Sequence, residues 1–396
     1  MLSFRIKQAR LAASLTLDEL AARLAARGRP LSKAALSKFE LGKARPTAAN
    51  LLALGGELGV STEHLLSETE MQLVWLAFRK NATLTQKAIA GVQAAAWLQV
   101  ERQLWLEDVA GVDTRLTLPP RRKVANAYDA EAAAAELRAT WGLGDAPIES
   151  LTQAAEDHGV VVVEIAASSG DFHGLSAVAN GCKPVIISAG AAPADRKRFN
   201  LGHELGHVVM DADGMPEKVQ EGLAHRFAGA LLVPSAAVHR ELGLKRRWLE
   251  LGELALLKKK YGLSIQAWAR RARDVGVIEA SEYQRLCIQI SSRGWRKLEP
   301  AAFEGSESPQ RAQMLVLRAL GEGLVTPSKA EELCPGVTRD IDGPPPRVSA
   351  RTLLRADAAT RAGALAASAA ALASEYATGG ALRHFDAVDR PMEDPL

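Results

Sequence analysis

The pentapeptide His-Glu-Leu-Gly-His at 203–207 constrains the fold of this 396-residue chain more than any other feature. Two histidines four residues apart lie on the same face of an α-helix, so a helix directs both imidazoles toward one point. Apolar residues such as Phe199, Leu201 and Val208 flank the pentapeptide, and they are typical of a buried helix. Because buried polar groups without partners are costly, the pattern predicts a helix whose two histidines share a ligand.

Zinc is the ligand expected between the two histidines. Imidazole nitrogens bind zinc, and a catalytic zinc takes three protein ligands and keeps one position for water. Glu204 follows the first histidine and is placed to take a proton from that water and later protonate a leaving amine. We therefore predict that His203 and His207 bind zinc and that Glu204 is the catalytic base.

A third zinc ligand is expected from the next helix, predicted at about 217–233 and stopped by Pro234. Glu221 lies early on that helix, beside an apolar stripe that includes Val219 and Phe227 and is expected to pack inward, and it is the preferred ligand. His225, one turn further on the same face, is the competitor. Asp211 and Asp213 are nearer in sequence but are expected in a loop.

Composition excludes several classes of protein. The chain is 47% hydrophobic and 24% charged, close to the average for soluble globular proteins. No apolar run approaches the roughly 18 residues of a membrane helix, and the N-terminus lacks the apolar segment of a signal peptide. Three widely spaced cysteines argue against a disulfide framework. We expect a cytoplasmic protein of two or three domains without a membrane partner.

Residues 1–66 form a basic helical segment, which we call the N-terminal module. Thr16 and Ser32 stand at helix N-cap positions ahead of apolar residues at helical spacing. The module has ten basic and five acidic residues, whereas the rest of the chain is slightly acidic. Such a basic module on a near-neutral body indicates a polyanionic partner, with an ordinary solvated surface as the alternative.

The remaining segments predict a multidomain chain that joins this all-α module to an α+β core. Residues 67–120 are predicted to be a helical connector of two helices, ending at Pro119-Pro120. The core is predicted at 124–300, with an Ala-rich helix up to Trp141, strands in the β-branched runs 160–165 and 184–188, and a helix at 194–211. A helical segment is expected at 301–340, followed by a linker and an Ala-rich C-terminal helix and tail at 341–396.

Several segments of the core carry a resemblance to a known family. They are RKRFNLG at 196–202, EGLAHRFAGALLVP at 221–234, Gly174-Leu175-Ser176 and the run PVIIS at 184–188. With these segments, residues 125–300 resemble the ImmA/IrrE family of zinc-dependent metallo-endopeptidases. The resemblance implies a zincin-like metallopeptidase core.

The same resemblance assigns roles to individual residues. It implies that His203, His207 and Glu221 bind Zn²⁺ and that Glu204 is the general base. The chain departs from the family at His225, where asparagine or aspartate is usual. Apart from the resemblance, the position of His173 just before Gly174 makes it a candidate for stabilising the tetrahedral intermediate, with a loop histidine of no catalytic role as the alternative.

The N-terminal module resembles Xre/Cro-type helix-turn-helix modules through TLDELA at 16–21 and SKAALSKFELGKARP at 32–46. The second helix of such a motif lies in the DNA major groove. Leu17 stands where the family commonly has a DNA-contacting glutamine, so a module kept for protein contacts is the alternative. The candidate contacts are Ser32, Lys33, Ser37 and Lys38 to base edges and Lys43 and Arg45 to phosphates.

The two resemblances together imply a regulatory zinc endopeptidase joined to its own DNA-binding module. Members of the family cut helix-turn-helix repressors or antitoxin-like proteins, so a protein of this kind is the expected substrate and duplex DNA the expected second partner. The alternative is a transcriptional regulator or antitoxin-like protein whose metal domain senses or binds without proteolysis. The presence of Glu204 favours the enzyme, and a homodimer is left open.

Overall fold

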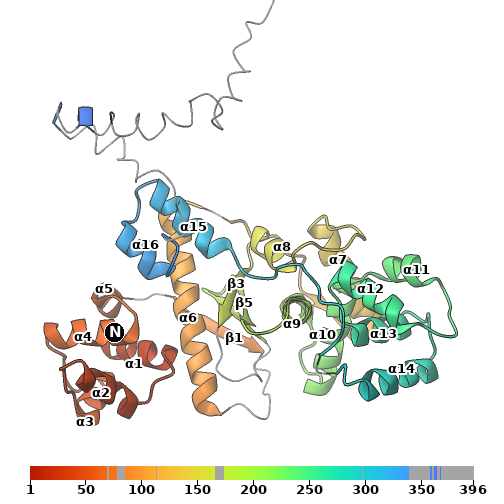
Figure 1. Cartoon of the computed structure of the whole chain (residues 1–396), viewed down its shortest axis with the longest axis horizontal. Helices are drawn as coiled ribbons and strands as arrows, with labels where there is room; N and C mark the ends of the chain where they lie inside the picture. Colours follow the sequence, from red (N-terminus) through yellow and green to blue (C-terminus); the bar gives the residue numbers. More distant parts are fainter. Residues whose placement is uncertain are drawn as a thin grey trace, which may run out of the picture. The chain divides into compact units, whose positions relative to one another are not determined.

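The computed structural model describes residues 1–68, 71–77, 85–112, 114–165, 174–296 and 298–338, together with 357–358, 361–363 and 366. Contacts divide the chain into two units, residues 1–312 and 313–396, and each is described by itself. Figure 1 shows the elements along the chain. His173 and most of the predicted C-terminal linker, helix and tail lie outside the described residues.

The N-terminal module is helical, as predicted, and its two N-caps are confirmed. The Thr16 hydroxyl accepts a hydrogen bond from the Glu19 backbone N–H, and the Glu19 carboxylate accepts one from the Thr16 N–H. The Ser32 hydroxyl accepts from the N–H of Ala35 in the same way. The helices of the module are α1 (Leu2–Ala12), α2 (Leu17–Ala26), α3 (Lys33–Glu40), α4 (Ala48–Leu58) and α5 (Thr62–Leu66).

The segment 67–120 differs from the predicted pair of helices. It contains strand β1 (Leu73–Ala77) and a single long helix, α6 (Gln86–Val109). Leu73 and Trp75 pack against the sheet core, while the alternate residues Val74 and Leu76 are exposed. Pairing with a strand about a hundred residues later outweighs the helical tendency of this stretch, because strand preference depends strongly on tertiary context.

The core contains a four-stranded mixed sheet of order β1-β4-β5-β3. Its other strands are β3 (Val161–Ile165), β4 (Gly174–Ala179) and β5 (Lys183–Ala189). β3 runs parallel to β5, whereas β4 is antiparallel to both β5 and β1. The predicted strands at 160–165 and 184–188 are thus confirmed as β3 and β5, and their continuous apolar runs fit strands buried on both faces.

Helices cover both faces of the sheet (Figure 1). α6 places Val92, Ala96 and Val100 against one face, while the other face joins the main core around α9 (Ala194–Val209). α9 packs against α10 (Glu217–Leu232), and these two are the helices predicted at 194–211 and 217–233. Val219, predicted to face inward with the α10 stripe, is instead 42% exposed.

The remaining elements of the core are short. The predicted Ala-rich helix is α7 (Ala127–Thr140). β2 (Arg122–Lys123) and β6 (Met210–Asp211) form a small parallel sheet. None of the helices in the described residues has the length and apolar character that crossing a membrane requires. The other core helices are α8 (Leu151–Asp157), α11 (Ser235–Leu242), α12 (Leu251–Tyr261), α13 (Ile265–Asp274) and α14 (Ala280–Ser292).

The segment predicted to be helical at 301–340 is only partly so. It contains α15 (Arg311–Gly321), which spans the division between the two units, and α16 (Pro327–Leu333) in the second unit. Residues 301–310 form no helix. Pro300 and Pro309 disfavour one there, because proline lacks the N–H that an α-helix needs and clashes with the preceding turn.

A buried ion pair holds the segment 301–310 to the core. Glu307 accepts from the guanidinium of Arg198 on α9 at 2.8 Å, and both side chains are fully buried. The same carboxylate accepts the backbone N–H groups of Leu151 (3.1 Å) and Thr152 (2.8 Å) at the start of α8. The Arg198 guanidinium also donates to the Tyr261 carbonyl at 2.6 Å. One carboxylate therefore links α9, α8 and the extended segment.

A second ion pair attaches the N-terminal module to α6. The guanidinium of Arg5 on α1 donates to both carboxylate oxygens of Glu101, at 2.6 and 2.7 Å. It also lies 5.1 Å from the ring centroid of Trp97, which Phe4 meets edge to face at 5.8 Å. α6 thus contacts the module as well as the sheet.

Candidate active site and nucleic-acid interface

The two histidines of the pentapeptide and Glu221 form one compact group, which we call the metal group. The Nε2 atoms of His203 and His207 lie 3.1 Å apart on α9. The carboxylate oxygens of Glu221 on α10 lie 3.4 Å from the Nε2 of His203 and 3.4 Å from that of His207. Within the described residues, this is the one cluster of three such side chains able to hold a metal ion.

The distances between the donor groups are close to those around a tetrahedral zinc. With bonds of about 2.0–2.1 Å, the ligand atoms of a tetrahedral ion lie about 3.3–3.4 Å apart. The two Nε2 atoms lie 3.1 Å apart, and each lies 3.4 Å from a different oxygen of the Glu221 carboxylate, so all three distances are close to that edge length. Two imidazoles and one carboxylate also form a donor set found in zinc enzymes. The residues present therefore fit the ion.

Glycines allow α10 to approach α9 closely enough to form this group. A Cβ at Gly206 would come within 3.1 Å of the Phe227 ring on α10. At Gly202, a Cβ would meet Ala228 of α10 at 3.5 Å. A side chain at Gly206 would therefore crowd the Phe227 ring between the two helices. The glycine inside the pentapeptide thus has a packing role.

Hydrogen bonds within the metal group favour the charged form of Glu221. The hydrogen bond with His203 has the largest effect and the one with His207 the next largest, and together they hold the pKa of Glu221 well below its ordinary value. Half burial of the carboxylate opposes this shift. A carboxylate must be ionised to bind a metal, so this electrostatic setting suits a ligand.

The competing third ligands lie beside the metal group. The ring of His225 stacks on Phe199 with centroids 5.9 Å apart and lies 4.6 Å from the ring of His203. Asp211 lies in β6, where its carboxylate accepts the backbone N–H of Asp213 at 3.2 Å. The geometry therefore groups Glu221 with the histidines in preference to these three.

Glu204 lies buried against the first residue of β4. A Cβ on Gly174 would come within 3.2 Å of the Glu204 Oε1 atom and 3.3 Å of its Cγ. Glycine at this position leaves the space that the Glu204 side chain occupies. Sequence reasoning noted Gly174 as part of a matching segment but gave it no role, because its neighbour on α9 is thirty residues away.

The candidate DNA contacts lie on and after α3. Lys33, Lys38, Lys43 and Arg45 are exposed, whereas Ser37 is half-buried. The Ser32 hydroxyl caps α3. The Lys33 ammonium pairs with Asp18 at 2.7 Å, and both side chains are largely exposed, so the pair is weak enough to exchange for a phosphate.

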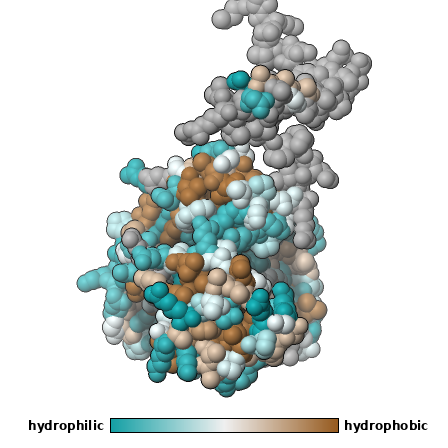
Figure 2. Space-filling view, turned by 90° about the vertical axis from the view of Figure 1, so that its left-hand side faces the viewer, coloured by the Kyte–Doolittle hydropathy of each residue, from teal (hydrophilic) through white to brown (hydrophobic). Residues whose placement is uncertain are grey.

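Apolar residues share this surface with the basic ones. Figure 2 shows hydrophilic residues interspersed with apolar patches on this side of the molecule. Leu41 follows α3 directly and is exposed, as is Leu52 on α4. The module therefore exposes both cationic and apolar side chains.

Two families match the chain. The profile of a peptidase family, the IrrE N-terminal-like domain, matches residues 155–273, which include the metal group and Glu204. A helix-turn-helix profile matches residues 6–65. No curated protein matches the chain. The protein thus carries a metallopeptidase-like domain of the IrrE N-terminal-like type, fused to a DNA-binding helix-turn-helix domain.

Proposed function

We propose that this chain is a zinc-dependent endopeptidase that hydrolyses a peptide bond in a regulatory protein. The observation that carries the proposal is the metal group, together with Glu204, the residue that directly follows His203. Bound zinc would polarise the scissile carbonyl and make hydroxide available near neutral pH. The match to a peptidase family supports the same chemistry.

The residues of the metal group and Glu204 would have different roles in hydrolysis. The imidazoles of His203 and His207 and the carboxylate of Glu221 would hold the ion. The Glu204 carboxylate, buried beside Gly174, would take the proton of the attacking water and deliver it to the leaving amine nitrogen.

A helix-turn-helix regulator is the substrate class that we propose, either a repressor or an antitoxin-like protein. The fused helix-turn-helix domain supports this choice, because it can place the peptidase on the same DNA as such a regulator. A cytoplasmic location follows from such a substrate. The competing function, in which the metal domain only senses or binds, requires the metal group but gives Glu204 no task.

Metal content tests the ligand assignment directly. We expect the purified chain to hold about one zinc, and His203→Ala, His207→Ala and Glu221→Ala to lose most of it, because a site with two ligands left binds weakly. Mass-spectrometric metal analysis after dialysis measures the stoichiometry. The control is His239→Ala, which should keep full zinc. A Glu221→Ala variant with full zinc would refute that ligand assignment.

DNA binding by the full chain should weaken steeply with salt. Cations that contact phosphates displace counterions, and each contact contributes about −0.9 to the slope of log affinity against log salt. Lys43→Ala and Arg45→Ala should each lower the slope by about one. Lys33→Ala and Lys38→Ala should also alter sequence preference. Fluorescence anisotropy measures the DNA affinity at several salt concentrations, with Lys245→Ala as the control variant. Binding that does not depend on salt would favour a module used for protein contacts.

A further inference from the structure

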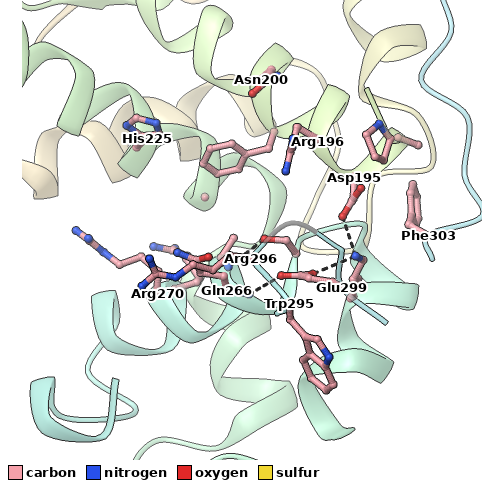
Figure 3. Close-up of a pocket in the computed structure, with 18 of the residues that line it drawn as sticks. Asp195, Arg196, Asn200, His225, Gln266, Arg270, Trp295, Arg296, Glu299 and Phe303 are labelled. Atoms are coloured by element: carbon pink, nitrogen blue, oxygen red, sulfur yellow. Dashed lines mark hydrogen bonds and ion pairs between the residues drawn. The ribbon is translucent and has the colours of Figure 1, made fainter. Parts of the chain in front are cut away.

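A cavity of about 770 Å³ lies beside the metal group without including it. It is bordered by α9, α10 and α13 and by the segment around 295–303 (Figure 3). Phe199 lies one turn before His203 on α9, and His225 lies one turn after Glu221 on α10; both line the cavity. The ring of His225 lies 4.6 Å from the ring of His203, so the cavity directly adjoins the metal group.

The acidic side chains that line the cavity are already paired. Asp195 and Glu299 both lie 3.0 Å from the buried ammonium of Lys258. Asp274 lies 2.9 Å from both Arg226 and Arg270. These ion pairs neutralise the negative charge of the three carboxylates and fix the positions of their side chains in the lining. Glu299 is fixed further, because its carboxylate accepts the first backbone N–H groups of α13.

Two arginines of the lining have no acidic partner among the described residues. Arg196 on α9 and Arg296 are exposed, and no carboxylate of the described residues lies within ion-pair distance of either. Figure 3 shows Arg196 above the cavity and Arg296 below it. The guanidinium group binds carboxylates and phosphates through two parallel hydrogen bonds, so this pair offers a site for an anion.

Aromatic rings contribute to the apolar part of the lining, and one of them, Phe303, is closely surrounded. The Arg198 guanidinium lies 4.4 Å from the Phe303 ring centroid. A Cβ at Gly262 or Gly305 would collide with this ring, so both glycines leave room for it. Phe199, Tyr283 and Trp295 add further rings to the lining, against which a flat ligand can pack.

We propose that this cavity binds an organic anion in which a phosphate or carboxylate is attached to a planar ring. The anionic group lies between Arg196 and Arg296, and the ring packs against Phe199. The volume falls within the range of about 300–1,000 Å³ typical of small-molecule sites. A free nucleotide-like molecule and a peptide segment with adjacent aromatic and acidic residues offer the same chemistry. The proposal does not depend on proteolysis.

Isothermal titration of the full chain tests the proposal. The probes are AMP, with adenosine as the ring alone and inorganic phosphate as the anion alone, and a blocked Phe-Glu dipeptide. AMP or the dipeptide should bind at least about tenfold more tightly than adenosine or phosphate, because charge-assisted hydrogen bonds add to ring packing. Binding of AMP alone indicates a free ligand, and preference for the dipeptide indicates a peptide segment.

Three variants locate the binding. The double variant Arg196→Ala/Arg296→Ala should weaken it about tenfold or more. Arg285→Ala, which removes an exposed arginine outside the lining, should leave it unchanged. His203→Ala should also retain it, which excludes anion binding at zinc. The proposal is overturned if neither AMP nor the dipeptide binds more tightly than adenosine and phosphate. It is also overturned if the double variant binds with wild-type affinity or if His203→Ala abolishes binding.

Discussion

Replacing Glu204 by glutamine is expected to lower peptide-bond hydrolysis by a factor of about 10²–10⁴, the usual contribution of a positioned general base. Zinc content should stay unchanged, because Glu204 is not one of the three members of the metal group. Glutamine has the same shape and fits the space beside Gly174, but its amide takes no proton from water. The variant therefore separates chemistry from metal binding.

The measurement is a time course of cleavage of a co-encoded helix-turn-helix regulator, with zinc analysis of the same samples. Glu217→Gln is a matched control, since this exposed carboxylate lies one turn before Glu221 on α10. A Glu204→Gln variant that cuts at the wild-type rate would rule out the proposed role. Equal inactivity of wild type and variant toward every regulator tried would favour a metal domain that senses without cutting.

Replacing Arg198 by alanine is expected to lower the free energy of unfolding by about 3–5 kcal/mol. The change leaves the carboxylate of Glu307 fully buried without its cation. It also removes the hydrogen bond to the Tyr261 carbonyl. Arg198 lies five residues before His203 on α9, so loss of this support acts on the helix that carries the metal group.

Denaturant unfolding followed by tryptophan fluorescence measures this effect. Arg122→Ala is the control, because the Arg122–Glu136 pair is exposed and such pairs contribute only about 0–1 kcal/mol. Replacing both Arg198 and Glu307 by methionine should recover part of the lost stability, because burying two apolar side chains carries no charge-desolvation penalty. An Arg198→Ala variant as stable as Arg122→Ala would show that the pair does not hold the segment 301–310.

Sequence reasoning succeeded where short-range patterns decide the structure. The spacing of His203 and His207 predicted α9, and the caps at Thr16 and Ser32 predicted α2 and α3. Each of these signals acts within one or two helical turns. The position of Glu221 on the neighbouring helix was also predictable, because the apolar residues after it repeat at helical spacing.

Long-range assembly set the limit of prediction. β1 was predicted to be helical, because a short apolar run does not reveal a partner strand at 174–179. The place of Gly174 beside Glu204 depends on the same sheet. The walls of the cavity come from segments spread between residues 193 and 303, so neither Arg196 nor Phe303 could be assigned to it from local sequence.

The pairing of β1 with β4 bears on how such a gene can recombine. Pro119-Pro120 marks a boundary in the sequence, but the preceding residues supply an edge strand and the helix that covers one face of the core sheet. A crossover at the prolines would deprive the peptidase-like domain of both. An exchange of DNA-reading modules between genes would therefore have to occur before residue 71, so that β1 and α6 are inherited with the core.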